Sequence, residues 1–174
     1  MEYTFTLKYQ LSEDVADADV LVERLGEAGC DDALVGIGQP GRMALEFTRE
    51  AETARAAVRS ALANVKSAIP SAKLVEVMPD FVGLTDVAGL VGVSRQAMRK
   101  LMLSHGARFP APVHEGSTSI WHLADVLGWL EARGGYALEP LMLEIARAAL
   151  EVNRFKASCG LSVDATRELE QLLA

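Results

Sequence analysis

The sequence predicts an α+β fold in three consecutive parts. Residues 1–79 show strand and helix patterns in the order β-α-β-β-α-β, residues 80–135 begin with two short helices joined at a glycine, and residues 136–174 contain two further helices. The chain has 174 residues, half of them hydrophobic, and can therefore bury one or two modest cores.

The first part opens with a strand over residues 3–11, in which every second residue is apolar. The elements expected after it are a helix from Val15 to Ala28, strands over about 33–37 and 43–48, a helix over about 51–68 and a strand over 73–78. This order is the split βαβ, or ferredoxin-like, arrangement. Pro79-Asp80 is the expected linker to the second part.

Both helices of such a unit lie on one face of an antiparallel sheet and leave the other face open. Thr4, Thr6 and Lys8 belong to the open face, which is either solvated or paired with a second subunit. Ferredoxin-like domains serve many unrelated roles, so a protein partner and a small-molecule effector both remain open for this part.

The segment from Gly36 to Gly41 has the Gly-x-Gly-x-x-Gly spacing of dinucleotide-binding turns. In those turns a helix follows and presents its amides to the pyrophosphate. Here residues 42–48 alternate like a strand instead. We therefore expect a hairpin turn and no cofactor.

The segment from Leu84 to Met102 predicts a helix-turn-helix, a motif that binds DNA. Its apolar positions fit two short helices that cross at Gly92, a residue that tolerates a left-handed backbone. Ala88 is small enough for the second helix to pack closely. Ser94 stands where the second helix needs an N-cap.

Arg95, Gln96, Arg99 and Lys100 project from the side of the second helix opposite its apolar residues. Arginine and lysine neutralise phosphates or pair with guanine, and glutamine pairs with adenine, so these residue types suit a major groove. The alternative is a short solvated helix with ordinary basic residues.

A hairpin is expected after the helix pair. The prolines of Phe109-Pro-Ala-Pro-Val113 keep that segment extended, and Gly116 permits a reversal before Ile120-Trp121 resume a strand pattern. A helix with apolar periodicity follows from His122 to Leu130.

Residues 81–133 resemble the excisionase/AlpA-like branch of the MerR-type winged helix-turn-helix DNA-binding domains. Three motifs carry the resemblance in the same order: Leu-Thr-x-Val-Ala-x-Leu-x-Gly-Val-Ser-Arg from residue 84, Phe-Pro-x-Pro from residue 109, and Trp-x-x-x-Asp-Val-x-x-Trp-Leu from residue 121. The match covers less than a third of the chain.

The resemblance implies that the second helix enters the major groove while the hairpin, or wing, touches the backbone or the minor groove. The recognition role then falls to Ser94, Arg95, Gln96, Arg99 and Lys100, and the wing role to His114, Ser117, Thr118 and Ser119. Family wings commonly carry a basic residue near the tip, whereas Glu115 stands there in this chain. We therefore expect the wing to add little salt-dependent affinity.

The charge distribution agrees with this interpretation and limits it. Residues 1–80 carry a net charge of −6, residues 81–135 carry +1, and residues 136–174 carry −2. The only part that is not acidic is the one that resembles a DNA reader. Because +1 is small for a DNA-binding unit, two copies acting together are expected.

Neither a metal site nor an active site is expected. His105, His114 and His122 have no further ligand at short spacing, so surface or capping roles are expected for them. No nucleophile, base and orienting group form a recognisable set, which argues against an enzyme. Trp121 and Trp129 occur at core spacing, and Cys30 and Cys159 are expected to be free thiols.

The last part predicts two helices after Gly134-Gly135. The second helix starts near Leu161 and aligns Leu169, Leu172 and Leu173. The first has an apolar stripe that needs either the rest of the chain or a second copy to pack against, which makes residues 136–174 a candidate dimerisation element. The stripe consists of Leu138, Leu141, Met142, Ile145, Ala149 and Val152.

The leading interpretation is a sequence-specific double-stranded DNA-binding protein, a bacterial or phage-type transcription regulator that acts as a homodimer in the cytoplasm. An excisionase-like factor that bends DNA is one alternative, and an antitoxin or adaptor that binds a protein is another. No membrane association is expected, because no run approaches the roughly 20 apolar residues that a membrane span needs.

Overall fold

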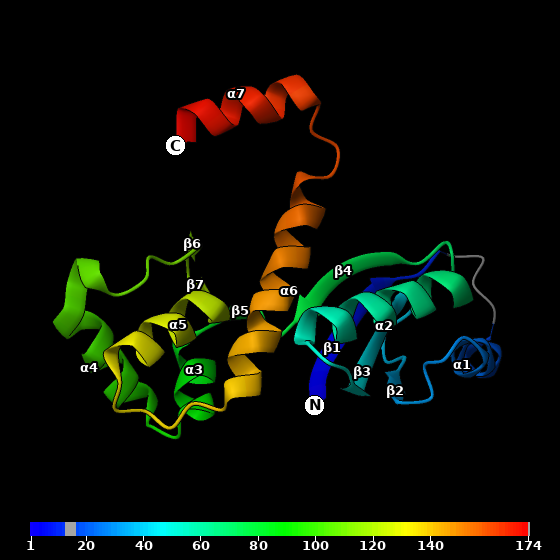
Figure 1. Ribbon diagram of the computed structural model, residues 1–174, viewed down its shortest axis with the longest axis horizontal. Coiled ribbons are helices and arrows are strands. Elements are labelled where there is room, and N and C mark those ends of the chain that lie inside the picture. Colours follow the sequence, from blue (N-terminus) through cyan, green and yellow to red (C-terminus); the bar gives the residue numbers. More distant parts are fainter. Residues whose placement is uncertain (13–16, 174) are drawn as a thin grey trace.

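A computed structural model describes residues 1–12 and 17–173. Within these residues it shows a mixed α+β architecture with seven α-helices and two antiparallel sheets. In Figure 1 the two sheets lie on opposite sides of helix α6 (Pro140–Ser158). The expected helix start at Val15 lies outside the described residues, and the described helix, α1, runs over Ala18–Glu27.

The first sheet has the strand order β2-β3-β1-β4, and all neighbouring strands are antiparallel. As predicted, Tyr3, Phe5, Leu7 and Tyr9 are buried on one face of β1. Phe5 stacks on its cross-strand partner Phe47 with ring centroids 5.3 Å apart. A one-residue slip would turn this apolar row outward, so burial fixes the register. The strands are β1 (Glu2–Gln10), β2 (Ala33–Gly36), β3 (Arg42–Glu50) and β4 (Lys73–Met78).

Helices cover one face of this sheet, and the other face is open (Figure 1). Helix α2 (Ala54–Ala68) begins at Thr53, whose hydroxyl accepts a hydrogen bond from the Ala56 amide at 3.1 Å. On the open face Lys8 pairs with Glu76 of β4 across 3.5 Å. The segment from Gly36 to Gly41 joins β2 to β3, so a strand follows it, as predicted.

A buried arginine ties β3 to the helix layer. The Arg49 guanidinium donates hydrogen bonds to both carboxylate oxygens of Asp32, at 2.6 and 2.8 Å, and to the Gly29 carbonyl at 2.8 Å. It also reaches Ser60 and Asn64 on α2. The hydrogen bond and charge of Arg49 hold the pKa of Asp32 below its ordinary value.

The second sheet has the order β5-β7-β6, and its core includes Val87, Met98, Trp121, Leu127 and Leu130. Trp121 is buried as predicted, whereas Trp129 is only partly buried. The sequence patterns did not indicate β5. The elements are β5 (Phe81–Val82), α3 (Leu84–Leu90), α4 (Arg95–His105), the 3₁₀ turn η1 (Gly106–Arg108), β6 (His114–Glu115), β7 (Ser119–His122) and α5 (Leu123–Arg133).

Helix α6 belongs to both cores. Ile145, Ala148 and Ala149 pack into the cluster of the first sheet, and Leu143 and Ala146 pack into the cluster of the second. The apolar stripe that the sequence predicts from Leu138 to Val152 therefore packs against the rest of the chain. Figure 1 shows α6 standing between the two parts.

A buried polar cluster joins the two parts where the chain passes between them. Asp80, only 1% exposed, accepts a hydrogen bond from Asn153 Nδ2 at 2.7 Å and lies 2.7 Å from His122 Nδ1. Asn153 also binds the amide and the carbonyl of Val77, at 2.9 and 2.8 Å. The expectation of a surface role for His122 is wrong, because the side chain is buried and Asp80 satisfies its ring nitrogen inside the protein. His122 does occupy the N-cap position of α5, but its side chain makes no capping hydrogen bond. Asp80, expected to be part of the linker, is likewise buried and is hydrogen-bonded to the second part and to α6.

Helix α7 (Val163–Leu173) has no buried residue. Leu172 and Leu173 are 72% and 83% exposed. Cys30 is buried and Cys159 is exposed, and both are free thiols as expected. No helix in the described residues combines the length and apolar character that crossing a membrane requires.

Candidate nucleic-acid interface

The turn between α3 and α4 is built by local hydrogen bonds. Gly92 has a φ of +70°, the left-handed conformation that the sequence analysis expected. Its amide reaches the Gly89 carbonyl at 3.3 Å, and the Val93 amide reaches the Ala88 carbonyl at 2.9 Å. This pair of bonds is the Schellman pattern, which ends a helix at a glycine. Helix α3 thus ends abruptly, and the chain is redirected into α4.

Helix α4 begins at its predicted N-cap. The Ser94 hydroxyl accepts a hydrogen bond from the Ala97 amide at 3.1 Å. Met98 is fully buried against α3, and Val87 and Ala88 of α3 are buried beside it in the same core. The cap and this buried methionine fix which side of α4 faces outward.

The outward side of α4 carries the predicted recognition residues. Arg95, Gln96, Arg99 and Lys100 are all exposed. They span the first two turns of an 11-residue helix that is about 16 Å long at 1.5 Å per residue. The four side chains therefore form one contiguous cationic and amide-bearing surface.

No acidic residue occurs in α4, and most carboxylates of residues 81–135 are used elsewhere. Asp86 accepts a hydrogen bond from the Gly83 amide at 2.8 Å, and Asp125 and Glu131 pair with Arg154 and Arg147 of α6 across 3.7 and 3.8 Å. Only the carboxylate of the hairpin remains. The net charge of +1 therefore understates how cationic the α4 surface is.

The hairpin is present but shorter than predicted. The sequence predicts an extended segment over residues 109–113 and a tip over residues 114–119, whereas the paired strand β6 consists of His114–Glu115, in the register His114 to Ile120. From the predicted segment, the Val113 amide donates a hydrogen bond to the Ile120 carbonyl at 2.8 Å. Proline has no amide hydrogen, so Pro110 and Pro112 cannot extend the ladder. The Pro110 carbonyl instead accepts a hydrogen bond from the Trp121 indole at 3.0 Å.

The predicted wing residues lie in the turn at the hairpin tip and on the two strands beside it. His114, Ser117 and Thr118 are exposed, and Ser119 is half-buried at the start of β7. Figure 1 shows this tip apart from α4, so the structure brings together the residues within each set but separates the two sets. A ligand that touches both must be long enough to bridge them, as a duplex is.

Two basic residues near α4 were missed by the sequence analysis. Arg108 is exposed on the turn that directly follows α4. The Arg133 guanidinium lies 5.8 Å from the centre of the Trp129 ring, which also meets the His105 ring of α4 edge-on at 5.2 Å. The one signal in the sequence was the charge count: together with the three cations of α4, Arg108 and Arg133 are all the lysines and arginines of residues 81–135.

Comparison with protein-family models, curated proteins and solved structures finds no match to this chain. The geometry and charge of the chain's own residues therefore provide the evidence for its function. The most developed surface is that of α4.

Proposed function

We propose that the protein binds double-stranded DNA sequence-specifically and acts as a transcription regulator, with residues 80–135 as a winged helix-turn-helix reader. The observation that carries this proposal is the outward side of α4, where Arg95, Gln96, Arg99 and Lys100 are exposed beside a buried Met98. Cationic and amide side chains on one helix face match the donors and acceptors of a major groove.

The strand order and the element order support the proposal of a ferredoxin-like first part and a winged helix-turn-helix second part. The order β2-β3-β1-β4 with two intervening helices is that of a ferredoxin-like unit over residues 1–79. A short helix, a four-residue turn, a second helix and a hairpin follow in the order of a winged reader. Residues 136–174 then add α6 and α7 as a C-terminal helical pair.

Each residue of the reader has a distinct expected contact. Arg95 and Gln96, in the first turn of α4, read base edges, because recognition helices contact bases through their N-terminal residues. Arg99 and Lys100, one turn further on, pair with phosphates or guanine. At the wing, phosphates are bound by His114 and by the hydroxyls of Ser117, Thr118 and Ser119. The hydroxyls form these hydrogen bonds without adding charge.

A homodimer is part of the proposal. Three cations on α4 neutralise few phosphates, and non-specific affinity rises steeply with their number. Two linked readers on one site raise the effective concentration of the second without new contacts. The expected operator is therefore a pair of related half-sites.

Selection from a random duplex pool at two salt concentrations tests the proposal. The parent protein should enrich one repeated or palindromic sequence. The double variant Arg99→Ala/Lys100→Ala should bind that sequence on the order of 100-fold more weakly, since each cationic contact is worth about 1–3 kcal/mol. Its salt dependence should also become shallower.

The matched control removes two exposed cations from the first part, Arg24→Ala/Lys73→Ala, and should leave binding unchanged. Equal binding by the α4 variant and the parent would show that α4 is not the reader. Gln96→Ala should relax the preference at one base position while leaving non-specific binding intact. Measured bending of the selected site would favour the excisionase-like architectural role.

A protein-binding adaptor is the second candidate, and the charge of the first part favours it. Residues 1–80 carry −6, and one sheet face there is open. A surface of that sign repels DNA and suits a basic protein partner. Failure to enrich any duplex, together with co-purification of one basic protein, would support the adaptor instead.

A further inference from the structure

A groove runs along the surface between α2 and α6. Val58, Arg59 and Leu62 line it from α2, and Ala148, Val152 and Phe155 line it from α6. Its volume is about 340 Å³. On both helices the lining residues recur with helical spacing, so each helix presents one continuous row to the groove. We refer to it as the α2/α6 groove.

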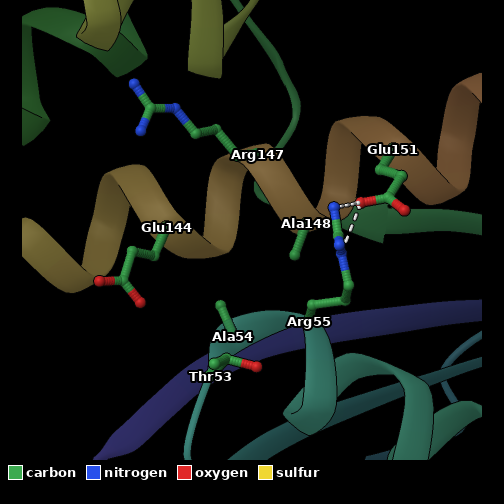
Figure 2. A pocket seen from close by; sticks show the side chains of 7 residues that line it. All are labelled: Thr53, Ala54, Arg55, Glu144, Arg147, Ala148 and Glu151. Atoms are coloured by element: carbon green, nitrogen blue, oxygen red, sulfur yellow. Dashed lines mark hydrogen bonds and ion pairs between the residues drawn. The ribbon is translucent and has the colours of Figure 1, made fainter.

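The groove continues toward the N-terminus of α2. Figure 2 shows this end, where Arg55 reaches from α2 to Glu151 of α6. Their guanidinium and carboxylate groups are 2.7 Å apart and both side chains are more than half exposed. Together the two segments extend along α6 from Glu144 to Phe155, about 16 Å at 1.5 Å per residue. That length accommodates three turns of a helix.

Phe155 is a lining residue of the groove whose apolar ring is left uncovered. Its ring is 72% exposed although it follows the partly buried Val152 in the same row. Arg59, on the facing wall, forms no ion pair within the described residues. The groove thus offers an exposed aromatic ring and a cation that has no ion-pair partner in the described part of the chain.

Helix α7 has the complementary surface. Ala165, Leu169, Leu172 and Leu173 fall on one face at the spacing i, i+4, i+7 and i+8. Glu168 and Glu170 flank this face on either side, and α7 carries three carboxylates against one arginine. Its 11 residues span about 16 Å. The lining of the groove carries three arginines, Arg55, Arg59 and Arg147, against two glutamates, Glu144 and Glu151. The length and apolar face of α7 therefore match the groove, and the net charges of the two surfaces have opposite signs.

We infer that α7 of one copy docks in the α2/α6 groove of a second copy, and that the exchange is reciprocal. In this arrangement α7 does not occupy the groove of its own chain, because it follows the C-terminal end of α6 and lies on the side away from α2 (Figure 1). Two-fold symmetry then gives two identical helix-in-groove contacts, which doubles the buried leucine surface. This arrangement rests on the homodimer of the proposed function and specifies its interface, and its test needs no DNA.

Sedimentation equilibrium of the full chain tests the inference. The parent should have twice the chain mass of 18.7 kDa. Leu172→Asp on α7 and Phe155→Asp in the groove should each raise the dimer dissociation constant at least about tenfold, since tenfold corresponds to about 1.4 kcal/mol and a buried leucine contributes about that or more. Both side chains are 72% exposed in the single chain, so neither substitution disturbs a core.

Mixing the two variants distinguishes this exchange from other dimers. A Leu172→Asp chain keeps an intact groove and a Phe155→Asp chain keeps an intact α7, so the mixture should form a heterodimer through one contact. Leu34→Asp is the matched control: Leu34 is 74% exposed on the open face of the first sheet, and the dimer should persist.

Three results would overturn the inference. A parent chain that stays monomeric at every concentration shows that no exchange occurs. A Phe155→Asp chain that stays fully dimeric shows that the groove is not used, as in direct pairing of two α7 helices. Dissociation by Leu34→Asp assigns the interface to the open sheet face. A monomeric parent would also remove the homodimer from the proposed function, whereas selection of duplex DNA by α4 is measured separately and can still succeed.

Discussion

Replacing Asn153 with alanine should destabilise the protein strongly. Asn153 is 4% exposed and makes three hydrogen bonds at the junction of the two parts, two to the Val77 backbone and one to the Asp80 carboxylate. A neutral hydrogen bond contributes about 1 kcal/mol and one to a charged group about 1.5–3 kcal/mol. The variant Asn153→Ala should therefore lose about 4 kcal/mol of unfolding free energy. For a chain of this size that lowers Tm by roughly 8–16 °C.

Two spectroscopic probes make this test specific to the junction. Both tryptophans lie in residues 80–135, so their fluorescence reports that part alone, whereas far-UV circular dichroism reports the whole chain. In urea the parent should show one coincident transition by both probes. In Asn153→Ala the two curves should separate, because α6 no longer holds Val77 and Asp80 together.

The neighbouring position supplies the control. Arg154 is 61% exposed and pairs with Asp125 only across 3.7 Å. Arg154→Ala should therefore change stability by less than about 1 kcal/mol. If Asn153→Ala lowers the free energy of unfolding by no more than Arg154→Ala does, and its fluorescence and circular dichroism transitions still coincide, then the buried cluster does not join the two parts.

Three other measurements check local features. Gly92→Ala should cost about 1–2 kcal/mol in urea unfolding because of its left-handed backbone, whereas Gly89→Ala, which meets nothing within 4 Å, should stabilise α3 by roughly 0.5–1 kcal/mol; equal effects would refute the turn geometry. The pKa of Asp32 is lowered in the folded state, so its ion pair stabilises the fold above the ordinary carboxyl range near pH 4, and this stabilisation is lost as the pH falls toward the folded-state pKa. Asp32→Asn should therefore reduce the loss of unfolding free energy on acidification, and an unchanged dependence of unfolding free energy on pH would contradict this. Burial raises the pKa of Cys30, so a thiol reagent should modify Cys159 alone in the native protein and both cysteines in denaturant; rapid native labelling of both would show that Cys30 is accessible.

Local patterns predicted most of the elements correctly. The β4 strand has the predicted bounds, and the alternation of β1 correctly marked its buried face. Gly92 and Ser94 predicted the end of α3 and the start of α4, because turn and cap residues act through their immediate neighbours. These are features in which a residue interacts within about one helical turn or one strand pleat.

The contacts that sequence analysis missed join residues distant in the chain. The Asp80 carboxylate meets His122 and Asn153, which are 42 and 73 residues away. Each of the three is polar, and hydrophobic periodicity gives no reason to bury any of them. The sequence did not predict that α6 packs into both cores for a similar reason. An apolar stripe indicates that one face of a helix is buried, but not which elements cover it.

For the candidate interface, periodicity predicted which side of α4 faces outward, because Met98 and its neighbours indicated the buried side. It did not predict Arg108 and Arg133, whose position depends on how the chain leaves α4 and on the stacking at Trp129. The hairpin was placed too early, since extended proline-rich backbone resembles a strand in sequence but lacks the amides to pair as one.

The sharing of α6 has a consequence for the order of events during biosynthesis. Ribosomes deliver the chain from its N-terminus, so the strands and helices of both earlier parts emerge before Ile145 and Leu143 exist to complete their interiors. We therefore expect that neither interior is complete until α6 has been synthesised, that is, until synthesis has passed Ser158. A ribosome-bound chain arrested before Pro140 should therefore be sensitive to protease throughout, and one arrested well beyond Ser158 should become resistant in both parts together.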